Sequence, residues 1–112
     1  IYVDDEKYVN MATAVSSSGP AYIFLVMEAL IDGAVHIGVR RDMAQRMIIQ
    51  TVLGSAKYAE ATGRHLADLR NEVTSPAGTT TEGLRALEKA GMRLAFIEAV
   101  QAAYEKAKRL GG

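Results

Sequence analysis

Apolar residues recur along most of the chain at three- and four-residue spacings, which is typical of α-helices. No stretch alternates apolar and polar residues for long enough to predict a β-strand. The 112 residues fit a single domain. The pattern therefore predicts an all-α fold of about six helices. Five of them are expected over residues 5–15, 20–37, 42–61, 79–90 and 92–110. A short helix that carries Leu66, Leu69 and Val73 is expected between the third and the fifth.

The predicted helix over residues 20–37 is apolar on nearly every side. Its polar residues Glu28, Asp32 and His36 are four apart and form one narrow stripe. A helix that is apolar nearly all round is buried nearly all round. Because a domain of this size can build only a modest core, we expect a partner chain to cover this helix.

Small and turn-forming residues mark the predicted helix ends. Ser16–Gly19 is expected to break the first helix, and Pro20 suits the first position of the second, where a missing N–H costs nothing. Thr79 is expected to cap the fifth helix, with Glu82 completing a capping box three residues later. Three glycines are expected to close helices: Gly38, Gly63 and Gly91.

The charge is balanced, with 13 Lys and Arg against 13 Asp and Glu. A domain without positive excess is a poor candidate for sequence-independent binding of nucleic acid, so no such partner is expected. Cysteine is absent, which excludes disulfides and cysteine-based metal sites. This composition is compatible with the cytoplasm, which is the expected location.

No signal peptide is visible, and the longest apolar run, Ala21–Met27, is far too short to cross a bilayer. No membrane association is therefore expected. The chain begins at Ile1 and not at Met, which suggests a piece of a longer protein.

The segment Thr74–Thr80 is the most suggestive candidate for binding chemistry. Its hydroxyls and small residues lead into a predicted helix start, where free backbone N–H groups and the helix dipole can hold a carboxylate or a phosphate. Gly78 would let a ligand approach the backbone closely. An ordinary capped helix after a proline turn has the same pattern, and on spacing alone it is the commoner outcome.

Other motifs are weaker or missing. The chain has no G-x-G-x-x-G fingerprint, and Leu84 and Arg85 stand where a P-loop requires Lys and Ser or Thr. His36 and His65 are isolated in the sequence, so no metal site is expected.

Two longer stretches resemble one enzyme family, the pyrroline-5-carboxylate reductases. Ala12–Tyr22 reads A-T-A-V-S-S-S-G-P-A-Y and resembles the family segment T-A-x-S-G-S-G-P-A-Y. Val73–Thr80 reads V-T-S-P-A-G-T-T and resembles the family loop V-T-S-P-G-G-T-T. Ser17 and Ala77 stand where the family usually has glycine, and both replacements are small.

The resemblance implies an intertwined helical dimerisation domain, similar to the C-terminal domain of 6-phosphogluconate dehydrogenase. Residues 1–112 would be the C-terminal dimerisation and substrate-binding half of the enzyme, without its N-terminal Rossmann domain. The implied partner is a second copy in a homodimer, or in a larger assembly such as a decamer. The implied reaction reduces 1-pyrroline-5-carboxylate to L-proline with NADPH or NADH, which the Rossmann domain would mainly bind.

The resemblance also implies the site residues. Ser75, Gly78, Thr79 and Thr80 would bind the substrate carboxylate, and Thr80, the expected catalytic residue, would also face the ring nitrogen. The turn Ser18, Gly19 and Pro20 would lie near the nicotinamide. Two alternatives stay open from the residues alone: a helical homodimerisation module without a ligand site, and the helical domain of a related imine or hydroxyacid reductase.

Overall fold

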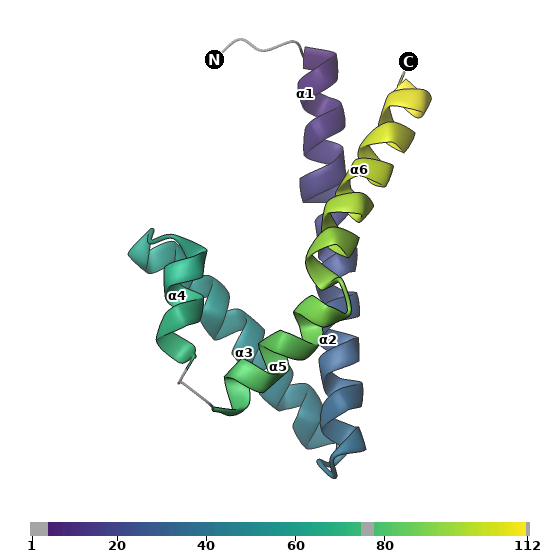
Figure 1. Ribbon diagram of the computed structural model, residues 1–112. Helices are drawn as coiled ribbons and strands as arrows, with labels where there is room; N and C mark the ends of the chain where they lie inside the picture. The colour runs from purple at the N-terminus through teal and green to yellow at the C-terminus, as the bar shows by residue number, and fades with distance from the viewer. Residues whose placement is uncertain (1–4, 75–77, 112) are drawn as a thin grey trace. The chain divides into compact units, whose positions relative to one another are not determined.

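The structure is a computed structural model that describes residues 5–74 and 78–111 (Figure 1). The described residues form α-helices and one π-helical turn, and they contain no strand, which confirms the all-α prediction. The elements are α1 (Asp5–Ala12), η1 (Thr13–Ser17), α2 (Gly19–His36), α3 (Arg41–Thr62), α4 (Leu66–Val73), α5 (Thr79–Lys89) and α6 (Met92–Gly111).

The predicted break at Ser16–Gly19 is wrong, because the chain stays helical without interruption over Asp5–His36. Pro20 has no N–H, and its ring crowds the carbonyl of Ser16, four residues earlier. The helix widens at this place, and the Ser18 N–H bonds the Thr13 carbonyl, five residues back, at 3.1 Å. Since α1, η1 and α2 are continuous, the described residues form five continuous helices where about six were predicted.

The chain divides into two compact units. One unit combines Ile1–Ile23 with Arg85–Gly112, and in it α1, η1 and α6 pack against one another. Ala14 of η1 is only 1 % exposed, so a small side chain lets these helices approach closely. The Tyr22 hydroxyl donates to the Ala99 carbonyl of α6 at 3.5 Å and links the start of α2 to the same helix.

The second unit, Phe24–Leu84, contains most of α2, all of α3 and α4, and the start of α5. Its buried apolar residues are Ala44 on α3 and Leu69 on α4. Gly63 ends α3 in the left-handed region, at a φ of 63°, and its N–H bonds the Ala59 carbonyl at 3.1 Å. This glycine turns the chain directly into α4.

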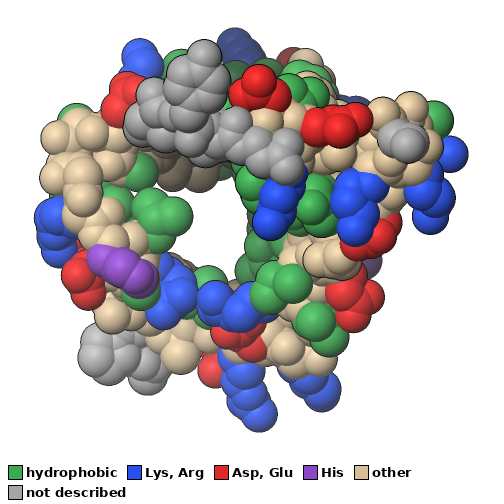
Figure 2. Space-filling view, turned by 90° about the horizontal axis from the view of Figure 1, so that it is seen from above, with side chains coloured by type: hydrophobic (Ala, Val, Ile, Leu, Met, Phe, Trp, Pro, Cys, Tyr) green, Lys and Arg blue, Asp and Glu red, His purple; other side chains and the backbone are tan. Residues whose placement is uncertain are grey.

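Much apolar surface stays uncovered in the single chain. None of the residues of α2 is buried, and Phe24 and Leu25 are 63 % and 62 % exposed. Figure 2 shows hydrophobic side chains open to view on one face, among charged side chains of both signs. The expectation that a partner chain covers α2 therefore stays a prediction.

By length and composition, the Asp5–His36 helix could also cross a membrane, since an 18-residue window within it has a mean hydropathy of 1.4. The apolar run Ala21–Met27 is short, but it lies within this longer helix, so the expectation that the chain has no membrane association stays a prediction. A helix that packs against a partner chain has the same composition, so length and hydropathy are weak evidence for a membrane span.

Substitution of Phe24 tests whether a partner chain covers α2. We expect Phe24→Asp to raise the dissociation constant of a dimer more than about a hundredfold, because burying an unpaired carboxylate costs several kcal/mol. Sedimentation equilibrium and a thermal melt measure the two consequences, loss of the dimer and loss of cooperative folding. Phe24→Leu, which keeps an apolar side chain, should stay dimeric. A dimer of wild-type strength in Phe24→Asp would place Phe24 outside the interface.

Gly63 provides a test of the α3–α4 turn. We expect Gly63→Ala to lower the free energy of unfolding by about 1–2 kcal/mol, because a Cβ disfavours positive φ. Nothing lies within 4 Å of the position that this Cβ would take, so the cost is conformational and not steric. Denaturant unfolding measures the loss. Gly63→Asn is the matched control and should lose less, since Asn tolerates this conformation better.

Candidate functional site

The start of α5 carries three of the predicted substrate residues. The helix begins at Thr79, and its first backbone bond runs from the Glu82 N–H to the Gly78 carbonyl at 3.4 Å. Gly78 thus takes the cap position, and the predicted cap, Thr79, is the first helical residue. Gly78 and Thr80 are half-buried, whereas Thr79 is exposed. The fourth predicted substrate residue, Ser75, lies outside the described residues.

This helix start has the chemistry of an anion site. The backbone N–H groups of Thr79 and Thr80 lie in the first turn, where a helix has no carbonyl to offer them. The helix dipole adds a partial positive charge at the same end. The Thr80 hydroxyl belongs to the same turn and is half-buried. A carboxylate can therefore bind here without an Arg or Lys.

Thr74 fixes the point at which the chain leaves α4. Its hydroxyl donates to the Arg70 carbonyl at 2.8 Å, and its N–H bonds the Asn71 carbonyl at 3.1 Å. The Thr74 backbone is extended, with φ −92° and ψ 108°. These bonds satisfy carbonyls that the end of a helix leaves unpaired.

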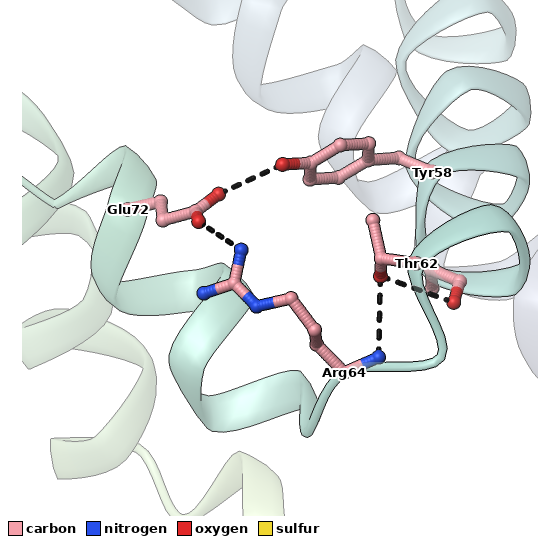
Figure 3. Close-up of polar contacts among 5 residues, drawn as sticks. Tyr58, Thr62, Arg64 and Glu72 are labelled. Carbon is pink, nitrogen blue, oxygen red and sulfur yellow. Dashed lines mark hydrogen bonds and ion pairs between the residues drawn. The ribbon is translucent and has the colours of Figure 1, made fainter.

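A polar network joins the end of α3 to the end of α4 (Figure 3). The Tyr58 hydroxyl donates to Oε1 of Glu72 at 3.0 Å, and the Arg64 guanidinium forms an ion pair with Oε2 of the same carboxylate. The hydrogen bond from Arg64 is the main reason why the pKa of Glu72 lies below its ordinary value, and the Tyr58 hydroxyl lowers it further. The same contact raises the pKa of Arg64.

Reasoning from the sequence missed this network. Arg64 and Glu72 are eight residues apart and lie on either side of the start of α4, so no helical spacing pairs them. The one available signal was Gly63, which predicts a tight turn that brings two helices together.

The predicted cofactor residues Ser18, Gly19 and Pro20 lie where η1 passes into α2, within the first compact unit. Ser18 and Gly19 are half-buried, and Pro20 is exposed. A Cβ at Gly19 would meet no atom within 4 Å, so a flat ring could approach the backbone here. These residues and the start of α5 belong to different units, and the structure describes each by itself.

Within residues 5–74 and 78–111, no group of three or more His, Asp or Glu side chains could hold a metal ion. His65 has a structural contact, because its Nδ1 accepts the Ala67 N–H at 3.2 Å and thereby caps α4.

Helices with uncovered apolar faces are typical of a dimerisation domain, and this is the class of protein that the fold indicates. The family model described as pyrroline-5-carboxylate reductase dimerisation matches residues 6–110. The chain belongs to this family, as its sequence resemblance indicated.

Curated relatives and solved structures agree with the family match. A pyrroline-5-carboxylate reductase of Synechocystis sp. is 49 % identical over 106 residues, which cover 95 % of this chain and 40 % of that protein. The structure of a pyrroline-5-carboxylate reductase from Coxiella burnetii is similar at a TM-score of 0.92 and 44 % identity, over 98 % of this chain and 41 % of that one.

The structure of a Plasmodium falciparum pyrroline carboxylate reductase with NADP bound is similar at a TM-score of 0.91 and 37 % identity. The match covers 95 % of this chain and 40 % of that one. The chain thus spans about two fifths of the length of the curated relatives that it matches.

The pH dependence of stability tests the Glu72 contacts. Because the pKa of Glu72 is lowered in the folded state, the contacts stabilise the fold above the ordinary glutamate pKa, and this stabilisation is lost as the pH falls through the lowered value. We expect Glu72→Gln to lower the melting temperature at pH 7 by no more than about 3 °C, since the pair is exposed, and to change it less at pH 3. Thermal melts at both pH values measure the difference. An equal loss at both would contradict a contribution from the charge of Glu72.

Proposed function

We propose that this chain is the dimerisation and substrate-binding part of an NAD(P)H-dependent enzyme that reduces 1-pyrroline-5-carboxylate to L-proline, the last step of proline biosynthesis. The observation that supports it best is the family match over residues 6–110, combined with a helix start suited to a carboxylate at Gly78–Thr80. The substrate is a cyclic imine that carries one carboxylate, which is the kind of anion that such a helix start can hold.

The loop holds the substrate by its carboxylate, with the N–H groups of Thr79 and Thr80 as donors and Ser75 as a further donor. Gly78 has no side chain, which leaves room for the carboxylate beside the cap. The Thr80 hydroxyl faces the ring nitrogen and orients the C=N bond. Two attachment points fix the plane of a small ring, and such positioning supplies much of the rate enhancement in reactions of this kind.

NAD(P)H, when bound, would supply the hydride that the imine carbon accepts. The C=N double bond becomes a single bond, and the ring nitrogen carries the proton that it gained as an iminium ion. No strong general acid is needed, because a cyclic imine is readily protonated in water. The residues of this chain therefore bind and orient the substrate. The Thr80 hydroxyl bonds the ring N–H while hydride addition neutralises the positive charge of the iminium ion.

The turn Ser18, Gly19 and Pro20 contacts the nicotinamide end of the cofactor. Its small, open backbone fits a flat ring, whereas the chain has no glycine-rich phosphate fingerprint for the rest of the dinucleotide. A Rossmann domain outside this sequence binds that part and decides between NADH and NADPH. The NADP in the Plasmodium relative supports a cofactor of this class.

The enzyme acts as a cytoplasmic homodimer, whose subunits cover each other's α2, and dimers associate into a larger ring such as a decamer. Mutual covering of α2 accounts for the exposed Phe24 and Leu25. A pure dimerisation module would need the same surface but would make no use of the loop at Thr74–Thr80.

The test is Thr80→Ala in the complete reductase that carries this domain. We expect kcat/KM for pyrroline-5-carboxylate to fall by about one to two decades, because a hydrogen bond to a charged group contributes about 1.5–3 kcal/mol. The KM for the nicotinamide cofactor should stay nearly unchanged. Steady-state kinetics with both substrates varied measure the two effects.

Thr80→Ser is the matched control and should keep most of the activity, since it retains the hydroxyl. A thermal melt of each variant separates loss of binding from loss of folding. Wild-type kcat/KM in a folded Thr80→Ala enzyme would refute the role of Thr80 and favour a plain helix cap.

A further inference from the structure

The turn Ser18–Pro20, which we call the cofactor turn, adjoins a contact between two helices of the first compact unit. That unit combines Ile1–Ile23 with Arg85–Gly112, so it contains the whole turn and all of α6. In it, α1 and η1 pack along α6 (Figure 1). The cofactor turn follows η1 directly, so it continues from the part of the helix that contacts α6.

Ala14 provides the contact with α6 before the turn. It lies four residues before Ser18, it is 1 % exposed, and it is the one buried residue of η1. The residues that follow it, Val15 and Ser16, are exposed. A small side chain lets two helices approach closely, and a larger one at the same place would push them apart. The separation of η1 and α6 therefore depends on Ala14.

Tyr22 provides the contact with α6 after the turn. It lies four residues after Ser18 and is half-buried, and its hydroxyl donates to the Ala99 carbonyl of α6 at 3.5 Å. Residues four apart in an α-helix lie on the same face, one turn from each other. The cofactor turn thus lies between two contacts with the same supporting helix.

The backbone between these two contacts departs from the α-helical pattern. The Ser18 N–H bonds the Thr13 carbonyl, five residues back, at 3.1 Å. The Ala21 N–H bonds the Ser18 carbonyl, three residues back, at 3.1 Å. Pro20 has no N–H to donate. Because the regular series of backbone bonds is interrupted here, the position of the turn depends on the contacts at either side of it. Such π-helical turns are rare and are frequent at functional sites.

The two contacts contribute more to placement than to stability. One is a single buried methyl group and the other is one long hydrogen bond, so neither removes much apolar surface from water. Both restrict where the backbone of the cofactor turn lies. A displacement of about 1 Å in a positioning group can change a rate or an affinity strongly.

We propose that Ala14 and Tyr22 are positioning residues, which hold the cofactor turn against α6 at the place where it meets the nicotinamide. This inference rests on the proposed function, since the turn matters only if it contacts the cofactor. Neither residue contacts NAD(P)H, and both act through the backbone of Ser18 and Gly19. A change at either residue should therefore weaken binding of the cofactor more than binding of pyrroline-5-carboxylate.

The experiment measures the dissociation constant of the nicotinamide cofactor in the complete reductase, without substrate, by fluorescence titration. We expect Ala14→Val to raise it about tenfold, because the added methyl groups displace η1 from α6. Ala14→Ser adds a single atom and should raise it less. Tyr22→Phe keeps the ring and loses a long hydrogen bond, so we expect a rise of about two- to threefold. In steady-state kinetics, the KM for pyrroline-5-carboxylate should change less in all three variants.

Two control variants make the same chemical changes within the same compact unit. Tyr8→Phe removes a hydroxyl from an exposed residue of α1. Ala102→Val adds methyl groups at an exposed position of α6. Both should leave the dissociation constant of the cofactor near wild type. A thermal melt of every variant is recorded beside the titration.

The outcomes separate the positioning role from the proposed function. If the folded Ala14 variants bind the cofactor as the controls do, the positioning role is wrong, and the proposed function is decided by Thr80→Ala. If the dissociation constant and the KM for pyrroline-5-carboxylate rise together, in proportion to the loss of melting temperature, the contacts are only structural and the inference is overturned. If Ala14→Val does not fold, Ala14→Ser and Tyr22→Phe decide by the same criteria. If the complete wild-type reductase binds no nicotinamide cofactor, the proposed function is wrong and the positioning role fails with it.

Discussion

The chain has more apolar side chains than it can bury by itself. Its buried apolar residues in the described regions are Ala14, Ala44 and Leu69, two of which contribute a single methyl group. So small a buried set cannot offset the conformational entropy lost when 112 residues fold. The chain belongs to a dimerisation family, so further burial against a partner chain is the prediction that follows.

The candidate site at the start of α5 depends mainly on backbone groups. The start of α5 offers backbone donors and a helix dipole, which can hold an anion without a charged side chain. Such a site depends on where the backbone lies more than on which side chains it has.

Helical periodicity was sufficient to predict the fold class and most helix bounds, because each helix has a repeated pattern over many residues. Pro20 misled the prediction at one place, since a proline usually ends a helix and here a π-helical turn accommodates it. Thr79 was predicted to be the cap residue, whereas it is the first residue of α5 and Gly78 is the cap. Cap and first-turn residues share the same preferences, so the sequence does not separate the two positions. The Arg64–Glu72 pair depends on the path of the chain through Gly63, which no short-range pattern contains. The motif resemblance located the candidate loop, and the described structure reaches it only from Gly78 onward and up to Thr74.

The π-helical turn has a consequence for the surface of the helix that contains it. One residue of an α-helix corresponds to about 100° of rotation, and a π turn inserts one residue without ending the helix. The side chains after Ser18 are therefore out of phase with those before Thr13. In the first compact unit, α1 and η1 pack against α6. The extra residue of the π-helical turn therefore decides which side chains of η1 face α6, and Ala14 is the one that is buried there.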